Sequence, residues 1–147
     1  MTEKFNLQRF KDAQARDYGT ALAELRSGRK RSHWIWYVFP QIDGLGRSPM
    51  ARQYAISGLA EAKAYLADNT LGPRLLECAQ ALLGLAANNP TAVLGYPDDL
   101  KVRSSMTLFE AAAEDDARWH VFGAVLSKYY EGKRDRTTLE ILAKQAE

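Results

Sequence analysis

Basic residues and glycines are concentrated in one segment, residues 28–49, in a combination suited to binding an anion. Glycines let backbone N–H groups approach a ligand closely, and cationic side chains supply the opposing charge. A helix end and a plain turn explain the same residues, because cations are also favoured at the C-terminus of a helix. The candidate ligand-binding residues of this kind are Lys30, Ser32, Gly44, Gly46 and Arg47.

The same segment holds a histidine and a run of aromatic residues. Each large ring buries roughly 150–250 Å², so we expect most of them to pack in the core. Trp34 or Trp36 could instead form a stacking wall, and Gln41 completes the candidate set. His33 lies beside a cationic run that favours the neutral imidazole, which is the form of a general base. A core histidine with satisfied hydrogen bonds is the alternative.

A second polar region follows Pro97. On a helix, Lys101 lies three and four positions before Ser104 and Ser105, which places them on one face. Adjacent serines are not favoured inside a helix, because their hydroxyls compete for the hydrogen bonds of the backbone. Their presence here is explained if the polar face of the helix lines a cleft. Lysine and serine can form a base–nucleophile pair; polar groups that tie helices together are the alternative. The candidate ligand-binding residues here are Asp99, Lys101, Ser104, Ser105 and Thr107.

A Ser/His/Asp triad can be written from Ser105, His33 and Asp99, but no G-x-S-x-G elbow supports it. The glycine turn at 44–49 matches neither the dinucleotide fingerprint nor the phosphate-binding P-loop. Two histidines without paired spacing predict no metal site. No motif calls for a cofactor.

The elements that must position these residues read as helices. Apolar residues recur every three or four positions, which predicts an all-α fold of about eight or nine helices in one compact domain, residues 1–147. The clearest stripe is Leu71, Leu75, Cys78, Leu82 and Leu85. We expect residues 34–39 to form a buried helical turn, since a strand there would have no partner. The predicted helix-end signals include the caps Asn6 and Ser57, Gly28, Ser48-Pro49, and Thr137 with Glu140.

Composition limits the class of protein. The chain of 147 residues is 46% hydrophobic and carries a net charge of +2. That charge is too small to predict nucleic-acid binding. Cys78 is the only cysteine, which excludes an intrachain disulfide and favours a buried thiol. No apolar run is long enough for a membrane span, and the first 14 residues lack a secretory apolar region. We therefore expect a cytoplasmic protein.

Long motifs in the chain resemble the bacterial family catalogued as domain of unknown function 1810. They are RFKDAQ at 9–14, ELRSGRKRSHWIWYVFPQIDGLGRSP at 24–49, YAISGLAEAKAYL at 54–66, LGPRLLEC at 71–78 and DDLKVRSSMTLF at 98–109. The resemblance implies a compact all-α domain and no particular reaction, because the family has no established activity. Some relatives carry the label calpastatin, after an unfolded inhibitor that this apolar-striped chain does not resemble.

Two functional hypotheses follow. The first is a binding or enzymatic domain for a small anionic molecule, such as a nucleotide or phosphate ester, with His33 as the acid–base group of any reaction. It requires Lys30 and Lys101 to face one recess. The second is a non-catalytic module that docks an acidic partner protein through residues 28–49. The sequence leaves open whether the protein is an enzyme, and its oligomeric state.

Overall fold

Helices and the turns between them account for nearly all of the chain. The computed structural model describes residues 5–146; residues 1–4, from the polar N-terminal segment, and residue 147 lie outside this range. The helices within it are α1 (Gln8–Ser27), α2 (Ile35–Val38), α3 (Pro49–Gln53), α4 (Leu59–Ala67), α5 (Leu71–Leu83), α6 (Pro90–Leu94), α7 (Asp98–Ala113), the 3₁₀ turn η1 (Ala117–Trp119), α8 (Val121–Tyr130) and α9 (Arg136–Gln145). The predicted all-α fold is confirmed.

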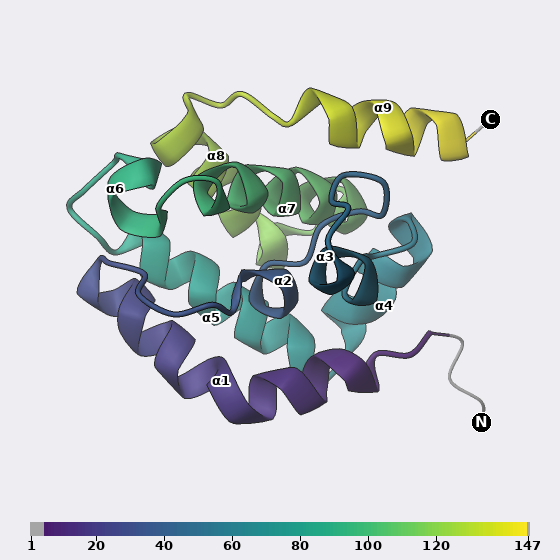
Figure 1. Cartoon of the computed structure of the whole chain (residues 1–147). Coiled ribbons are helices and arrows are strands. Elements are labelled where there is room, and N and C mark those ends of the chain that lie inside the picture. Colours follow the sequence, from purple (N-terminus) through teal and green to yellow (C-terminus); the bar gives the residue numbers. More distant parts are fainter. Residues whose placement is uncertain (1–4, 147) are drawn as a thin grey trace.

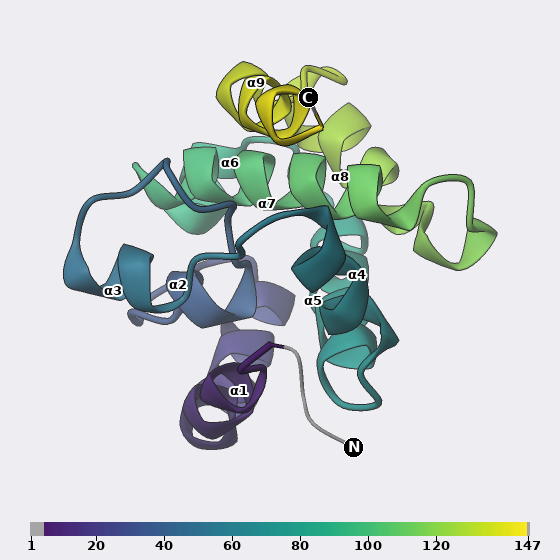
Figure 2. The same cartoon turned by 90° about the vertical axis from the view of Figure 1, so that its right-hand side faces the viewer.

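Helix α7 lies at the centre of the fold and touches more elements than its neighbours do. It packs against α2, α4, α6, α8 and α9, while α5 packs against α1, α4 and α8. Figures 1 and 2 show α1 and α9 at opposite ends of the molecule, with α7 between them. Within residues 5–146 the β-type pairing is limited to one parallel bridge, between Ile42 and Ile56.

Aromatic rings from four helices meet in the core around Phe109 of α7. Its ring centroid lies 5.2 Å from that of Tyr65 and 6.1 Å from that of Phe122. Tyr65 in turn meets Phe10 edge to face at 5.2 Å. Such pairs contribute about 0.5–1.5 kcal/mol beyond the burial of their area. The rings therefore join α1, α4, α7 and α8 into one body.

The apolar stripe of α5 is buried along four of its five predicted positions. Leu71, Leu75, Cys78 and Leu82 are each at most 1% exposed, whereas Leu85 is only partly buried and follows the helix end. Burial raises the pKa of the Cys78 thiol to about 12, so it stays a neutral packing group at neutral pH. The expected buried thiol is confirmed.

The predicted helix ends at Gly28 and Ser48-Pro49 are correct. The caps Asn6 and Ser57 are wrong, because the N-cap positions of α1 and α4 are Leu7 and Gly58. Gly28 closes α1 in the left-handed conformation, with φ 81°. The Ser48 hydroxyl caps α3 by accepting a hydrogen bond from the Ala51 N–H at 3.1 Å, with Pro49 in the first turn. The Thr137–Glu140 capping box is wrong, because Asp135 caps α9 by accepting from the Thr138 N–H at 3.0 Å. Aspartate and threonine are both good caps, so sequence alone did not separate them.

Replacing Phe109 by alanine tests this description of the core. The variant leaves a cavity between Tyr65 and Phe122, and we expect it to lower the free energy of unfolding by about 3–5 kcal/mol. Leu139→Ala is the matched control, since Leu139 is 43% exposed and its truncation should change stability by about 0.5 kcal/mol or less. Urea denaturation of both variants measures the difference. Equal effects would contradict the central place of α7.

Candidate functional site

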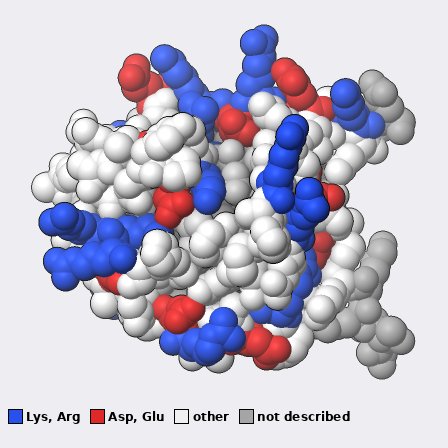
Figure 3. Space-filling view, viewed as in Figure 1, with Lys and Arg blue, Asp and Glu red and all other residues white. Residues whose placement is uncertain are grey.

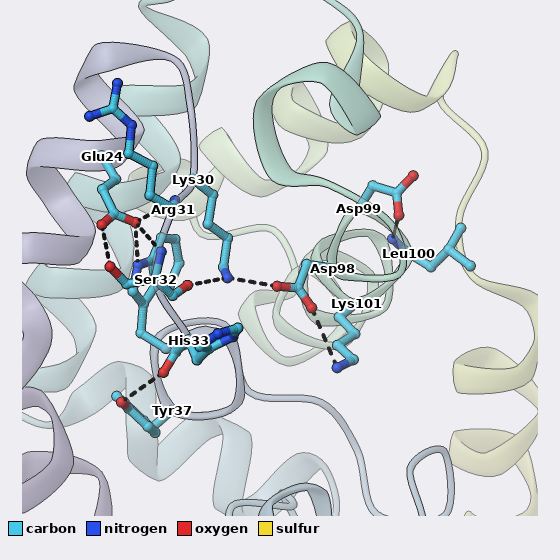
Figure 4. Close-up of polar contacts among 11 residues, drawn as sticks. Glu24, Lys30, Arg31, Ser32, His33, Tyr37, Asp98, Asp99, Leu100 and Lys101 are labelled. Carbon is cyan, nitrogen blue, oxygen red and sulfur yellow. Dashed lines mark hydrogen bonds and ion pairs between the residues drawn. The ribbon is translucent and has the colours of Figure 1, made fainter.

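The carboxylate of Asp98, at the start of α7, joins the two polar regions of the sequence. Its Oδ2 lies 2.8 Å from the Lys30 Nζ, and its Oδ1 lies 3.4 Å from the Lys101 Nζ. Figure 4 shows both lysine side chains directed toward this carboxylate, Lys30 from the loop after α1 and Lys101 from α7. The two stretches therefore fold against each other, but the Lys30 side chain is 6% exposed and does not line the cleft that Lys101 lines, so the two lysines do not face one recess.

The Lys30 side chain is buried, and its ammonium group already has partners within the protein. It is only 6% exposed, and the ammonium group also donates to the backbone carbonyl of Ser32. The same group lies 4.9 Å from the centre of the Trp34 ring, within the range of a cation–π interaction. Its backbone N–H donates to the Val93 carbonyl at 2.7 Å. Through these contacts, Lys30 connects the loop after α1 to helices α6 and α7.

A residue that sequence reasoning missed, Glu24, organises the basic loop. Its Oε1 accepts hydrogen bonds from the backbone N–H of Arg31 at 2.8 Å, from that of Ser32 at 3.0 Å and from the Trp34 indole at 2.9 Å. Its Oε2 accepts from the Ser32 hydroxyl at 2.6 Å. Partial burial alone would raise the pKa of Glu24, but these hydrogen bonds outweigh it and lower the pKa to about 2. The only signal in the sequence was its place at the start of the long motif.

The aromatic run packs mainly in the core, as expected. Trp34, Tyr37 and Phe39 are each at most 3% exposed, and the predicted helical turn is α2. Trp34 is therefore not a stacking wall. Trp36 is half-buried, and the Lys101 ammonium group lies 5.3 Å from the centre of its ring.

His33 and the proposed triad are not assembled. The His33 side chain is exposed, and its backbone carbonyl accepts from the Tyr37 hydroxyl at 3.3 Å. Asp99 instead accepts from the Thr91 hydroxyl at 2.6 Å, while the fully buried Ser105 hydroxyl has no partner among the described residues. No hydrogen bond within residues 5–146 links any two triad members, so this arrangement supplies no activated nucleophile.

A cleft of about 210 Å³ opens between three segments that are distant in the sequence. They are the loop after α2, the first turns of α7 and the start of α9. Its lining residues are Gln41, Leu45, Gly46, Pro97, Leu100, Lys101, Ser104, Asp135 and Thr137. Four of these, Gln41, Gly46, Lys101 and Ser104, belong to the predicted site. The sequence analysis did not predict the two lining residues at the start of α9, Asp135 and Thr137, because no spacing in the sequence connects them to the other two segments.

The polar groups of the cleft differ in how far the protein already satisfies them. The Ser104 hydroxyl donates to the Leu100 carbonyl of its own helix at 3.2 Å. The side chains of Gln41 and Thr137 have no hydrogen-bond partner among the described residues. The Lys101 side chain is 25% exposed, and its ammonium group has the longer contact with Asp98 and the cation–π contact with Trp36. Lys101, Gln41 and Thr137 are therefore the groups most available to a ligand.

The other predicted site residues lie outside the lining. Arg47 is exposed in the loop next to the cleft, and Gly44 has φ 107° in the same loop. Thr107 is buried and donates to the Arg103 carbonyl at 2.8 Å. Ser32 is held by Glu24, and Figure 4 shows Asp99 pointing away from both lysines.

Other surface hollows lie near the end of α7 and around η1. One of about 490 Å³ is lined by Lys63, Ala112, Ala113, Glu114, Asp115 and Asp116. Its single lysine is held by Glu114 at 2.7 Å. A neighbouring hollow of about 330 Å³ is lined by Trp119, Arg118 and residues of α4 and α5. None of their lining residues belongs to the predicted site.

Surface charge and metal-ligand geometry add little to the site. Figure 3 shows cationic and anionic side chains scattered around a mostly uncharged centre on the face it presents. No group of three or more His, Cys, Asp or Glu residues in the described part of the chain could hold a metal ion. None of the described helices combines the length and apolarity needed to cross a membrane.

These features define an all-helical protein with a small mixed polar and apolar cleft. The chain belongs to the family described as "Protein of unknown function (DUF1810)", whose profile matches residues 4–142. It is 50% identical to a conserved hypothetical protein from Mycobacterium tuberculosis, whose crystal structure superimposes with a TM-score of 0.91. That match covers 96% of this chain and 99% of the other. No curated protein matches. The resemblance noted in the sequence is confirmed, and the function is uncharacterised.

Glu24→Gln tests the role of Glu24 in the basic loop. The amide cannot accept all the hydrogen bonds of the carboxylate, so we expect a loss of about 1–2 kcal/mol in the free energy of unfolding at neutral pH. Because the pKa of Glu24 is lowered from 4.5 to about 2, its stabilisation is complete above pH 4.5 and is lost as the pH falls through that interval. Urea unfolding between pH 2 and 7 should show the two proteins converging in acid. Glu140→Gln, on the exposed face of α9, is the control.

Proposed function

We propose that this protein binds a small anionic molecule in the cleft between the loop after α2, α7 and α9. The observation that carries the proposal is the sharing of one carboxylate by two lysines. Among the described residues, Asp98 is the only acidic side chain within 4.0 Å of either Lys30 or Lys101. One positive charge is therefore left uncompensated at this contact, and Lys101 presents it at the cleft wall.

The distances indicate which lysine has the freer charge. Lys30 is buried and close to Asp98, whereas Lys101 is partly exposed and 0.6 Å farther from it, at 3.4 Å against 2.8 Å. A partly exposed ion pair of this kind contributes little, about 0–1 kcal/mol. An anion in the cleft can therefore gain the Lys101 ammonium group without breaking a strong contact. Lys30 keeps the loop in place.

The size of the cleft favours a small ligand. Its 210 Å³ is less than the roughly 300–1,000 Å³ of sites for drug-sized molecules. A short phosphate ester fits such a volume better than a whole nucleotide does. The free amide of Gln41 and the hydroxyl of Thr137 supply additional hydrogen bonds.

The arrangement supports binding more than catalysis. Ser104 donates to its own helix and Lys101 faces Asp98, so the two do not form a base–nucleophile pair. The exposed ring of His33 is not part of the cleft lining. The alternative of docking an acidic partner through residues 28–49 has less support, because three of the four aromatic rings in that segment are buried.

Lys101→Met tests the proposal while keeping the apolar part of the side chain. Wild-type protein should bind glycerol 3-phosphate in isothermal titration calorimetry, and the variant should bind it about tenfold more weakly, a change of about 1.4 kcal/mol. Lys63→Met is the matched control: it also removes a partly exposed lysine from an ion pair, but not from this cleft. We expect wild-type affinity for the control.

Two results would contradict the proposal. One is the absence of saturable binding by the wild-type protein to inorganic phosphate, glycerol 3-phosphate and AMP alike. The other is equal weakening of binding by Lys101→Met and Lys63→Met, which would indicate nonspecific attraction to surface charge.

A further inference from the structure

The same cleft contains an acceptor that constrains the chemistry of its ligand. We propose that the ligand is a short hydroxyl-bearing phosphate monoester, in which a hydroxyl group donates a hydrogen bond to Asp135 while the phosphate meets Lys101. This inference rests on the proposed function and adds a specificity-determining residue to it. Asp135 comes from the start of α9, on a different element from Lys101.

One carboxylate oxygen of Asp135 accepts hydrogen bonds within the protein, whereas the other accepts none. Its Oδ2 accepts from the Thr138 backbone N–H at 3.0 Å and from the Thr138 hydroxyl at 2.6 Å. Its Oδ1 lies 3.8 Å from the Arg103 Nη2, which is too long for a hydrogen bond. An ionised carboxylate accepts at both oxygens and donates at neither. A ligand group that meets Asp135 must therefore be a donor.

Arg103 makes an acidic group compatible with an anionic ligand. Its guanidinium group faces the Asp135 carboxylate at that 3.8 Å separation and offsets its charge. It does not line the cleft itself. A phosphate held at Lys101 is thus not opposed by a bare negative charge on α9, and Asp135 acts as a hydrogen-bond acceptor.

Asp135 is also held in a fixed position before any ligand arrives. Its backbone N–H donates to the Thr107 hydroxyl at 2.9 Å, and that hydroxyl donates to the Arg103 carbonyl. The preceding residue, Arg134, makes two hydrogen bonds to Glu110 of α7, at 2.6 and 2.7 Å. A fixed acceptor loses less entropy on binding than a mobile one. Thr107, predicted as a ligand contact, is instead a support for one.

The apolar part of the lining favours a short carbon skeleton between the two polar ends. Leu45, Pro97 and Leu100 contribute carbon surface to the cleft, alongside the polar side chains of α7 and α9. Contact with carbon removes apolar area from water, which is favourable by about 25 cal/mol per Å². A three-carbon phosphate ester is the simplest probe with these properties.

Two esters with the same chain length separate the inference from the proposed function. Glycerol 3-phosphate and n-propyl phosphate share the phosphate and the three carbons, and differ in two hydroxyl groups. In calorimetric titrations the wild-type protein should bind glycerol 3-phosphate about tenfold more tightly, the value of one hydrogen bond to a charged acceptor. Lys101→Met should weaken both esters by the same factor.

Asp135→Asn assigns the preference to one residue. Asparagine is an equally good helix cap, so α9 should remain in place, but its amide N–H₂ is a donor where the carboxylate was an acceptor. We expect the variant to bind n-propyl phosphate as the wild-type protein does and to lose the preference for glycerol 3-phosphate.

Each outcome decides one of the two claims. If wild-type protein binds both esters equally and Lys101→Met weakens both, the hydroxyl inference is overturned and the proposed function stands. If the wild type prefers glycerol 3-phosphate and Asp135→Asn keeps that preference, Asp135 is not the acceptor. If neither ester binds, the hydroxyl inference is overturned, and the proposed function fails with it when inorganic phosphate and AMP do not bind either. The wild-type comparison requires no variant, so a folding defect in Asp135→Asn cannot obscure it.

Discussion

The position of Asp98 between two lysines is the interaction on which the rest of the site depends. It is the first residue of α7, so its ion pair with Lys30, whose side chain is 6% exposed against 18% for Asp98, fixes the basic loop against the central helix of the fold. Removing Asp98 would leave the charge of the buried Lys30 side chain without an anionic partner. The same carboxylate only partly satisfies Lys101. Structure and binding capacity thus arise from one acidic residue with two cationic neighbours.

Most of the residues singled out in the motif at 24–49 have a structural role: they hold the loop after α1 against α7. Glu24 holds the backbone of the loop and the Trp34 indole, Lys30 anchors the loop to α7, and the rings of α2 fill the core. A segment rich in charged and aromatic residues can therefore serve to hold elements of the fold together. At the cleft, the side chains of Lys101, Gln41, Thr137 and Asp135 have bonding capacity that the described residues do not use in full.

The helices were predictable from sequence, and the site only in part. Apolar spacing and local caps act over a few residues, so the Ser48-Pro49 start signal recovered α3 and periodicity recovered most of the longer helices. The sequence could not predict features that depend on tertiary contacts. Asp135 and Thr137 are both good helix caps, and only the contact of Asp135 with α7 decides which of them caps α9. Lys30 and Lys101 do lie on either side of one carboxylate, but they do not face one recess as expected, because Lys30 is buried by packing that no local pattern encodes.

The most direct test of the account is an NMR titration of the ¹⁵N-labelled protein with glycerol 3-phosphate. The account predicts saturable chemical-shift changes concentrated in residues 41–46, 97–104 and 135–137, the three walls of the cleft. The three segments should titrate with a single dissociation constant, because one ligand contacts them all. Changes centred on Glu114 to Arg118, or no saturable change, would contradict the assignment of this cleft as the binding site.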